Sequence, residues 1–85
     1  MGVYMVAFES PTQDYRLYHE FLQRFDTMRL SDTAWAVQSD LEADALYRDL
    51  EPLLGKDDHA YIFTLNKPWI GYGYEAMNDW LGRHL

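Results

Sequence analysis

Few residues in this sequence combine a reactive side chain with a position that could use it, and Glu9 is the first of them. Glu9 directly follows the apolar run Val3–Phe8, which is rich in strand-forming residues. Its carboxylate is therefore expected at the end of a buried strand. Two such carboxylates could share a divalent metal ion, which would activate a water for phosphodiester attack. The alternative is a solvated acid that helps to cap the segment after the strand.

The basic residues and the histidines offer weaker chemistry. Arg16 and Arg24 share one face of a predicted helix, where they could contact phosphate or pair with Glu20 and neighbouring acids. His19, beside Glu20, could act as a general base or be a half-buried surface residue. Three histidines lack the local spacing of a zinc site: His19, His59 and His84.

Aromatic residues form a third group. The four that stand out are Trp35, Trp69, Tyr72 and Tyr74. Aromatic rings on a sheet can stack nucleic-acid bases, but they also build cores and protein interfaces. The segment Trp69–Tyr74 is expected near a sheet edge, where an exposed aromatic strand invites pairing with another chain. We therefore predict a partner surface there.

The charge and composition limit the classes of function. Asp and Glu number 14 against 7 Lys and Arg, giving a net charge of −7, which disfavours general nucleic-acid binding. The acidity provides solubility or an acidic face for a basic partner. The chain has no cysteine, which excludes a disulfide scaffold, a thiolate metal site and a thiol nucleophile.

Length and hydrophobic content indicate one folded domain over residues 1–85. A hydrophobic content of 48% excludes intrinsic disorder. No apolar run approaches the length of a membrane helix, and the N-terminal segment lacks the features of a signal peptide. We expect a soluble, cytoplasmic protein that does not enter a membrane.

Hydrophobic periodicity predicts alternating strands and helices that must position these side chains. The expected strands are Val3–Phe8, Thr27–Leu30, Thr33–Gln38, His59–Leu65 and a short edge strand at Trp69–Tyr72. A first helix, capped by Thr12 or Asp14, has an apolar face that runs to Phe25, and a second begins at a Ser39–Glu42 capping box and runs to about Leu54. A last helix is expected over Glu75–His84. This order predicts an α+β, ferredoxin-like βαββαβ fold with an extra short edge strand, a C-terminal helix, and the helices on one face of an antiparallel sheet.

Six short strings of the sequence carry a family resemblance: Tyr4–Glu9, Asp32–Val37, Ser39–Glu42, Asp57–Phe63, Trp69–Tyr72 and Asn78–Leu81. They resemble strings of the small CRISPR spacer-acquisition subunit, the Cas-two family, and more closely those of its SinR-like relatives. The resemblance implies a ferredoxin-like homodimer whose sheets pack face to face. In nuclease members, an Asp at the end of strand one in each protomer binds a divalent metal such as magnesium or manganese at the dimer axis. The matching residue here is Glu9, whose carboxylate extends further from the backbone.

Three functions follow from these observations. The first is a non-catalytic, dimeric, Cas-two-like protein that binds another protein through acidic and aromatic surfaces. The alternative is a metal-dependent endonuclease in which Glu9 is the catalytic and metal-binding residue, paired across a dimer. The second alternative is an acidic inhibitor that mimics nucleic acid. The first explains the acidity and the aromatic residues together, and we take it as the expectation.

Overall fold

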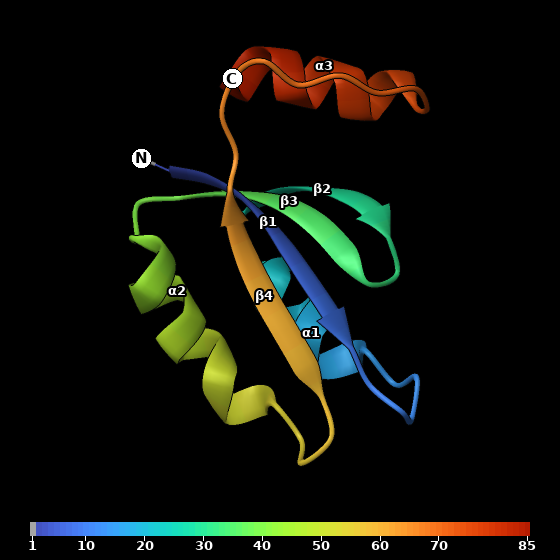
Figure 1. Ribbon diagram of the computed structural model, residues 1–85, viewed down its shortest axis with the longest axis vertical. Coiled ribbons are helices and arrows are strands. Elements are labelled where there is room, and N and C mark those ends of the chain that lie inside the picture. Colours follow the sequence, from blue (N-terminus) through green and yellow to red (C-terminus); the bar gives the residue numbers. More distant parts are fainter. Residues whose placement is uncertain (1) are drawn as a thin grey trace.

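Residues 2–85 are described by a computed structural model, and they form an α+β fold in the order β-α-β-β-α-β-α (Figure 1). The strands are β1 (Gly2–Glu9), β2 (Asp26–Ser31), β3 (Ala34–Ser39) and β4 (His59–Thr64). The helices are α1 (Arg16–Leu22), α2 (Ala43–Leu50) and α3 (Glu75–His84), with a 3-10 turn, η1 (Glu51–Leu53), directly after α2. The predicted last helix is confirmed with the same bounds.

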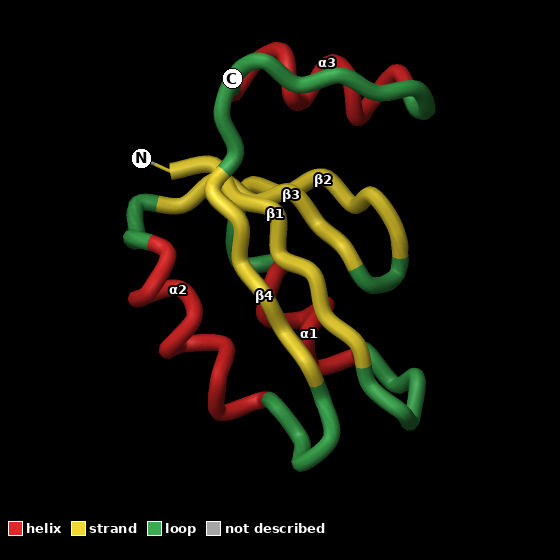
Figure 2. The backbone as a smooth tube through the Cα atoms, in the orientation of Figure 1, coloured by secondary structure: helices red, strands yellow, loops and turns green. Residues whose placement is uncertain are grey.

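The strands form one antiparallel sheet in the order β2-β3-β1-β4. The apolar strand β1 is central and pairs with β3 on one side and β4 on the other. Strands β2 and β4 lie at the two edges (Figure 2). The register places Glu9, at the end of β1, opposite His59, at the start of β4.

The sheet buries side chains on both faces because successive residues of a strand point to opposite sides. On one face, Tyr4, Val6 and Phe8 of β1 pack against α1 and α2, whose buried residues include Leu22 and Leu46. We call this the helix-covered face. On the second face, the alternate positions of the strands contact α3. The buried members of this smaller cluster are Val3, Ala36, Met77 and Trp80.

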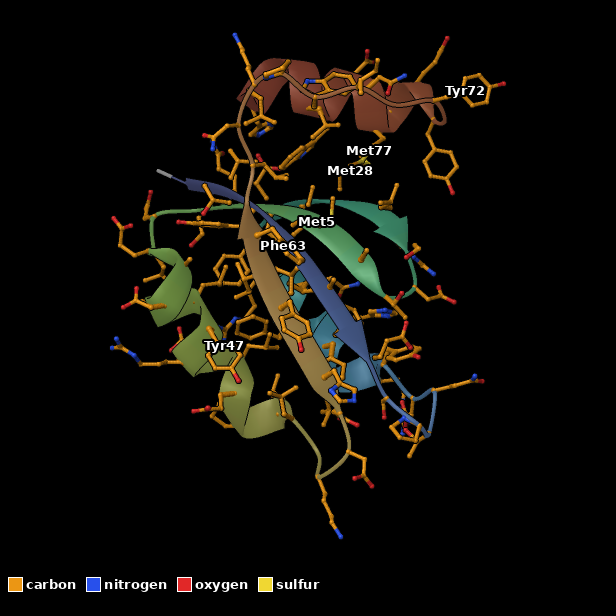
Figure 3. All side chains as sticks on the ribbon, viewed as in Figure 1. Met5, Met28, Tyr47, Phe63, Tyr72 and Met77 are labelled. Carbon is orange, nitrogen blue, oxygen red and sulfur yellow. The ribbon has the colours of Figure 1, made fainter. Side chains whose placement is uncertain are left out.

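The position of α3 corrects one prediction, because the three helices do not share a face of the sheet. Helix α3 lies apart from α1 and α2 (Figure 2). Met77 of α3 faces Met28 of β2, with Met5 of β1 nearby (Figure 3). Because Val3 and Met5 alternate with Tyr4 and Val6, both faces of β1 carry apolar side chains. Helix α3 packs on the face that carries Val3 and Met5.

The extra edge strand predicted at Trp69–Tyr72 does not form in the described residues 2–85. Leu65 extends the ladder by one bond, donating its N–H to the Val3 carbonyl at 2.8 Å. The chain then bends at Lys67 and runs as an irregular segment to α3. Gly71 and Gly73 weaken a short strand by their conformational freedom, which is a physical reason for the difference.

Both predicted helix starts are also wrong by a few residues. Helix α1 begins at Arg16 with Tyr15 at the N-cap, although the Asp14 carboxylate does accept the Arg16 N–H at 3.3 Å. Helix α2 begins at Ala43, and the Ser39–Glu42 capping box does not form. The Ser39 hydroxyl instead accepts the Leu41 N–H at 3.0 Å, because Ser39 is the last residue of β3.

The two helices also end earlier than predicted. Helix α1 ends at Leu22, before Phe25. Helix α2 ends at Leu50 and is followed by the tighter turn Glu51–Leu53. Pro52 lies within that turn and has no N–H to continue an α-helical ladder. Pro52 therefore explains why the last turn after α2 is tighter than an α-helix.

Candidate functional site

Glu9 occupies the exposed end of β1, as the sequence predicts. Its Oε2 accepts a hydrogen bond from the Tyr15 hydroxyl at 3.3 Å. Glu9 and His59 line a shallow hollow on the second face of the sheet together with Ala7 and Tyr61. Within residues 2–85, no group of three or more potential ligands is placed to hold a metal ion. A divalent metal bound by Glu9 would therefore take its remaining ligands from water or from another molecule.

Arg16 and Arg24 do not share a helix face as predicted, because α1 ends at Leu22. The Arg16 guanidinium forms a two-point ion pair with Asp14, at 3.0 and 2.9 Å, and this pairing lowers the pKa of the Asp14 carboxyl. The Arg24 guanidinium lies over the Phe21 ring, 4.7 Å from its centroid. A cation above an aromatic face is stabilised by the ring quadrupole. Both guanidinium groups therefore contact side chains of this chain, Arg16 at the start of α1 and Arg24 just after its end.

Trp35 is part of the core and does not belong to the partner surface, which corrects the prediction. It lies on the helix-covered face and is buried. The His19 ring packs on it with centroids 5.1 Å apart, and the His19 Nε2 is 2.8 Å from the Asp32 carbonyl. Burial, followed by the charge of Arg29, lowers the pKa of His19. Both effects favour the neutral imidazole.

The other three predicted aromatic residues do lie together on the surface. Trp69, Tyr72 and Tyr74 border a groove of about 580 Å³ between the segment after β4 and helix α3. We call it the aromatic groove; its other large apolar lining residues are Met5, Leu30, Leu65, Ile70, Met77, Leu81 and Leu85. Tyr72 points away from the body of the protein (Figure 3).

Sequence analysis did not single out Tyr61 and Phe63 of β4 as exposed apolar residues, and it included Ile70 only as part of the segment Trp69–Tyr74. Ile70 has 99% of its surface exposed, and Tyr61 and Phe63 of β4 are 63% and 57% exposed. Tyr61 and Phe63 alternate with Ala60 and Ile62, which point to the helix-covered face. This alternation is visible in the sequence, but it does not reveal which of the two faces α3 leaves open.

Tyr18 and Asp58 hold the opposite end of the molecule together. The buried Tyr18 hydroxyl donates to the Asp58 carboxylate, which also accepts the Gly55 N–H at 2.9 Å. Donation from Tyr18, then from Ser10 and Gly55, lowers the pKa of Asp58, whereas burial is the main cause of the raised pKa of Tyr18. Asp57 lies in a turn that is closed by the Asp58 N–H, which donates to the Gly55 carbonyl at 3.2 Å.

Helix α3, which forms one wall of the aromatic groove, is held to β2 by a polar link. The Trp80 Nε1 donates to Asp26 Oδ1 at 3.0 Å, and His84 Nε2 lies 2.8 Å from Asp26 Oδ2. The rings of Trp80 and His84 stack with centroids 4.0 Å apart. The hydrogen bonds from Trp80 and His84 lower the pKa of the Asp26 carboxyl.

This link predicts an acid-sensitive attachment of α3. The pKa of Asp26 is lower in the folded protein than in the unfolded chain. The ionised Asp26 carboxylate therefore contributes fully to stability above the unfolded pKa of about 4, and this contribution is lost as the pH falls through the folded-state pKa. We expect the Asp26→Asn variant to lose less stability than the wild type between pH 5 and pH 3. Urea unfolding followed by circular dichroism at several pH values measures this. If the free energy of unfolding of the variant fell with pH as steeply as that of the wild type, Asp26 would not be the cause of the acid sensitivity.

The geometry defines a small α+β domain with four antiparallel strands and an exposed aromatic groove beside its last helix. No family model matches the chain, and no curated protein matches it, so the resemblance to the Cas-two and SinR-like proteins has no support from these comparisons. None of the helices within residues 2–85 is long and apolar enough to cross a membrane.

Proposed function

We propose that this chain is a non-catalytic, homodimeric interaction protein with a ferredoxin-like, Cas-two-like fold that binds another protein through the aromatic groove. The observation that carries the proposal is the exposure of Ile70 and Tyr72, beside Trp69 and Tyr74, on one continuous apolar groove. Large exposed apolar patches mark interaction sites, and aromatic residues are enriched in the centres of protein interfaces. Covering this groove removes apolar surface from water, which favours association.

The ferredoxin-like part of the proposal is supported by the arrangement of the first six elements. Helices α1 and α2 pack on the same face, and β1 lies between β3 and β4. A β-α-β-β-α-β order with this strand arrangement is that of the split βαβ folds. Helix α3 is an addition to this pattern, and it supplies a wall of the aromatic groove.

The charge of α3, which has two exposed acidic residues and one exposed arginine, Arg83, suggests the chemistry of the partner. Glu75 and Asp79 are exposed on α3, and the chain as a whole has a net charge of −7. A matching partner would insert apolar side chains into the groove and place Lys or Arg at its rim. Rim charges mainly increase the association rate and make it depend on salt, whereas the apolar centre provides most of the affinity.

We expect the double variant Ile70→Ser/Tyr72→Ser to lose partner binding by on the order of a hundredfold while keeping the fold, since both side chains are almost fully exposed. The matched control is Leu17→Ser, which removes an exposed leucine of α1, far from the groove. Immobilised wild type, control and double variant would be compared for quantitative capture of proteins from the source cells. The captured protein would then be purified and its affinity measured against all three.

Equal affinity of the three proteins for the captured partner would contradict the assignment of the groove. The nuclease alternative is favoured by one observation, the exposed Glu9 opposite His59. Cleavage of short DNA or RNA by the wild type that requires Mn²⁺ or Mg²⁺, and that is absent with EDTA and in Glu9→Ala, would replace the proposal with that alternative. Salt-sensitive binding to a basic nucleic-acid enzyme would instead favour the acidic inhibitor.

A further inference from the structure

The two edges of the sheet differ in how well they are protected from pairing with another strand. Edge strand β2 has a break in its register between Arg29 and Ser31, carries the charges of Asp26 and Arg29, and contacts α3. Bulges, charges and a covering helix are the usual devices that stop an edge from pairing. Edge strand β4 pairs with β1 in continuous register. Its ionisable residues are His59 and Tyr61.

The free backbone groups of β4 can be identified from its pairing with β1. Leu65 donates its N–H to the Val3 carbonyl, so this pair is a hydrogen-bonded one. In an antiparallel ladder, hydrogen-bonded pairs alternate with pairs that are not. The residues of β4 whose N–H and C=O groups point away from β1 are therefore Ala60, Ile62 and Thr64. Each of them presents one donor and one acceptor at the edge of the sheet.

We infer that β4 pairs with β4 of a second copy of this chain, so that two sheets join edge to edge about a twofold axis. The inference rests on the homodimer of the proposed function and names its interface. The sequence of β4 is suited to pairing with itself, because no lysine, aspartate or glutamate of one copy would face the same charge in the other. This absence of charge matters because two copies of a chain of net charge −7 repel one another as a whole.

The backbone selects one register. Only when Ile62 lies opposite Ile62 of the partner subunit are all three outward residues, Ala60, Ile62 and Thr64, placed in hydrogen-bonded pairs. Tyr61 then lies opposite Phe63 of the partner subunit, and Phe63 opposite the partner's Tyr61. These are non-hydrogen-bonded positions, where side chains are closest, and aromatic pairs across strands are stabilising.

Exposure of the side chains agrees with this arrangement. Tyr61 and Phe63 already pack on each other with ring centroids 6.5 Å apart, and both point to the open part of the second face. A second copy would extend this pair into a row of four rings. Figure 1 shows β4 at the border of the sheet, with α2 beside it, and α2 contacts β4 from the helix-covered face.

The test uses two double variants that differ only in the sign of one charge. In Tyr61→Lys/Phe63→Glu, the inferred register places each new lysine opposite a new glutamate, and the dimer is retained. In Tyr61→Lys/Phe63→Lys, lysines lie opposite lysines, and we expect the dimer to be weakened on the order of tenfold to a hundredfold. The second variant has a net charge closer to zero than the first, so general repulsion between copies predicts the reverse order. Leu17→Lys, on α1, serves as a control that keeps the dimer.

Analytical ultracentrifugation over a range of concentrations gives the dissociation constants, and circular dichroism confirms that each variant is folded. A dimer in the wild type, in the Leu17→Lys control and in the Lys/Glu variant, but not in the Lys/Lys variant, supports the β4 interface. Unchanged dimers in both double variants would overturn it while leaving a homodimer with another interface, such as sheets packed face to face. Loss of the dimer in both double variants would overturn the register. If residue 61 of one copy lay opposite residue 61 of the other, both variants would place lysine against lysine. A monomeric wild type would overturn the homodimer itself.

Discussion

Replacing Trp80 with alanine is expected to lower the free energy of unfolding by about 3–5 kcal/mol and to release α3 from the sheet. Trp80 is the most buried aromatic side chain of the second face, with 1% of its surface exposed. Its Nε1 donates to Asp26 Oδ1 at 3.0 Å, and its ring stacks on the His84 ring with centroids 4.0 Å apart. Alanine therefore removes apolar burial, a hydrogen bond and a ring contact together. Urea unfolding measures the loss, and hydrogen exchange at the amides of α3 shows whether the helix detaches.

The matched control is Trp69→Ala, which removes the same side chain from the rim of the aromatic groove. Trp69 is 37% exposed, so a smaller loss of stability, about 1 kcal/mol or less, is expected. Similar losses in both variants would contradict the view that Trp80 anchors α3. A large loss for Trp80→Ala with unchanged exchange in α3 would place its role in the sheet instead.

The second large effect is expected at Leu46, which joins α2 to the sheet. Leu46 is completely buried in the cluster that contains Val6 and Leu50. Leu46→Ala should destabilise the protein by about 2–5 kcal/mol, because the cavity that it leaves is surrounded by side chains of both the helix and the sheet. Thermal unfolding with calorimetry, together with urea titration, measures the change.

An exposed leucine provides the comparison for Leu46. Leu17 of α1 is 57% exposed, and Leu17→Ala should change the stability by no more than about 0.5 kcal/mol. A loss at Leu17 as large as that at Leu46 would mean that α1 turns a different side toward the sheet. A negligible loss at Leu46 would mean that α2 does not pack as described.

Local patterns were sufficient to predict the elements that depend on local chemistry. Strand β1 follows from the unbroken apolar run Val3–Phe8, and it needs no further information because it is buried on both faces. Helix α3 was predicted with the same bounds. An acidic residue in its first turn, basic residues in its last turn and the spacing of Met77 and Trp80 all indicate the same helix.

Tertiary pairing explains the elements that were predicted incorrectly. A strand requires a neighbour, and the segment Trp69–Tyr72 leaves the sheet after Leu65. The capping signal at Ser39 is strong locally, but Ser39 pairs with Gly2 at the end of β3, so the helix cannot begin there. The same limit applies to the candidate site. The alternation around Trp35 shows that one side of β3 is apolar, but burial under α1 is a property of the whole fold.

The link between Asp26, Trp80 and His84 could not be predicted from the sequence for a related reason. Its members belong to β2 and α3, which lie far apart along the chain, and no spacing rule connects them. Glu9 was placed correctly at an exposed strand end because its position follows from the apolar run before it. Its bond to Tyr15 and its position opposite His59 depend on α1 and β4, and only the structure shows them.

The central position of β1 has a consequence for how the protein reaches its fold. Both of its neighbours, β3 and β4, come later in the chain, so β1 emerges from the ribosome with two unpaired edges and an apolar surface on each side. Neither edge is satisfied by a local hairpin, and pairing with β4 closes a loop that includes α1, the β2–β3 hairpin and α2. Such long-range closure slows folding relative to helical domains of the same size. The nascent chain therefore exposes its most apolar strand for longest, and mutations that weaken the β2–β3 hairpin or α2 should reduce the soluble yield in cells more than their effect on equilibrium stability suggests.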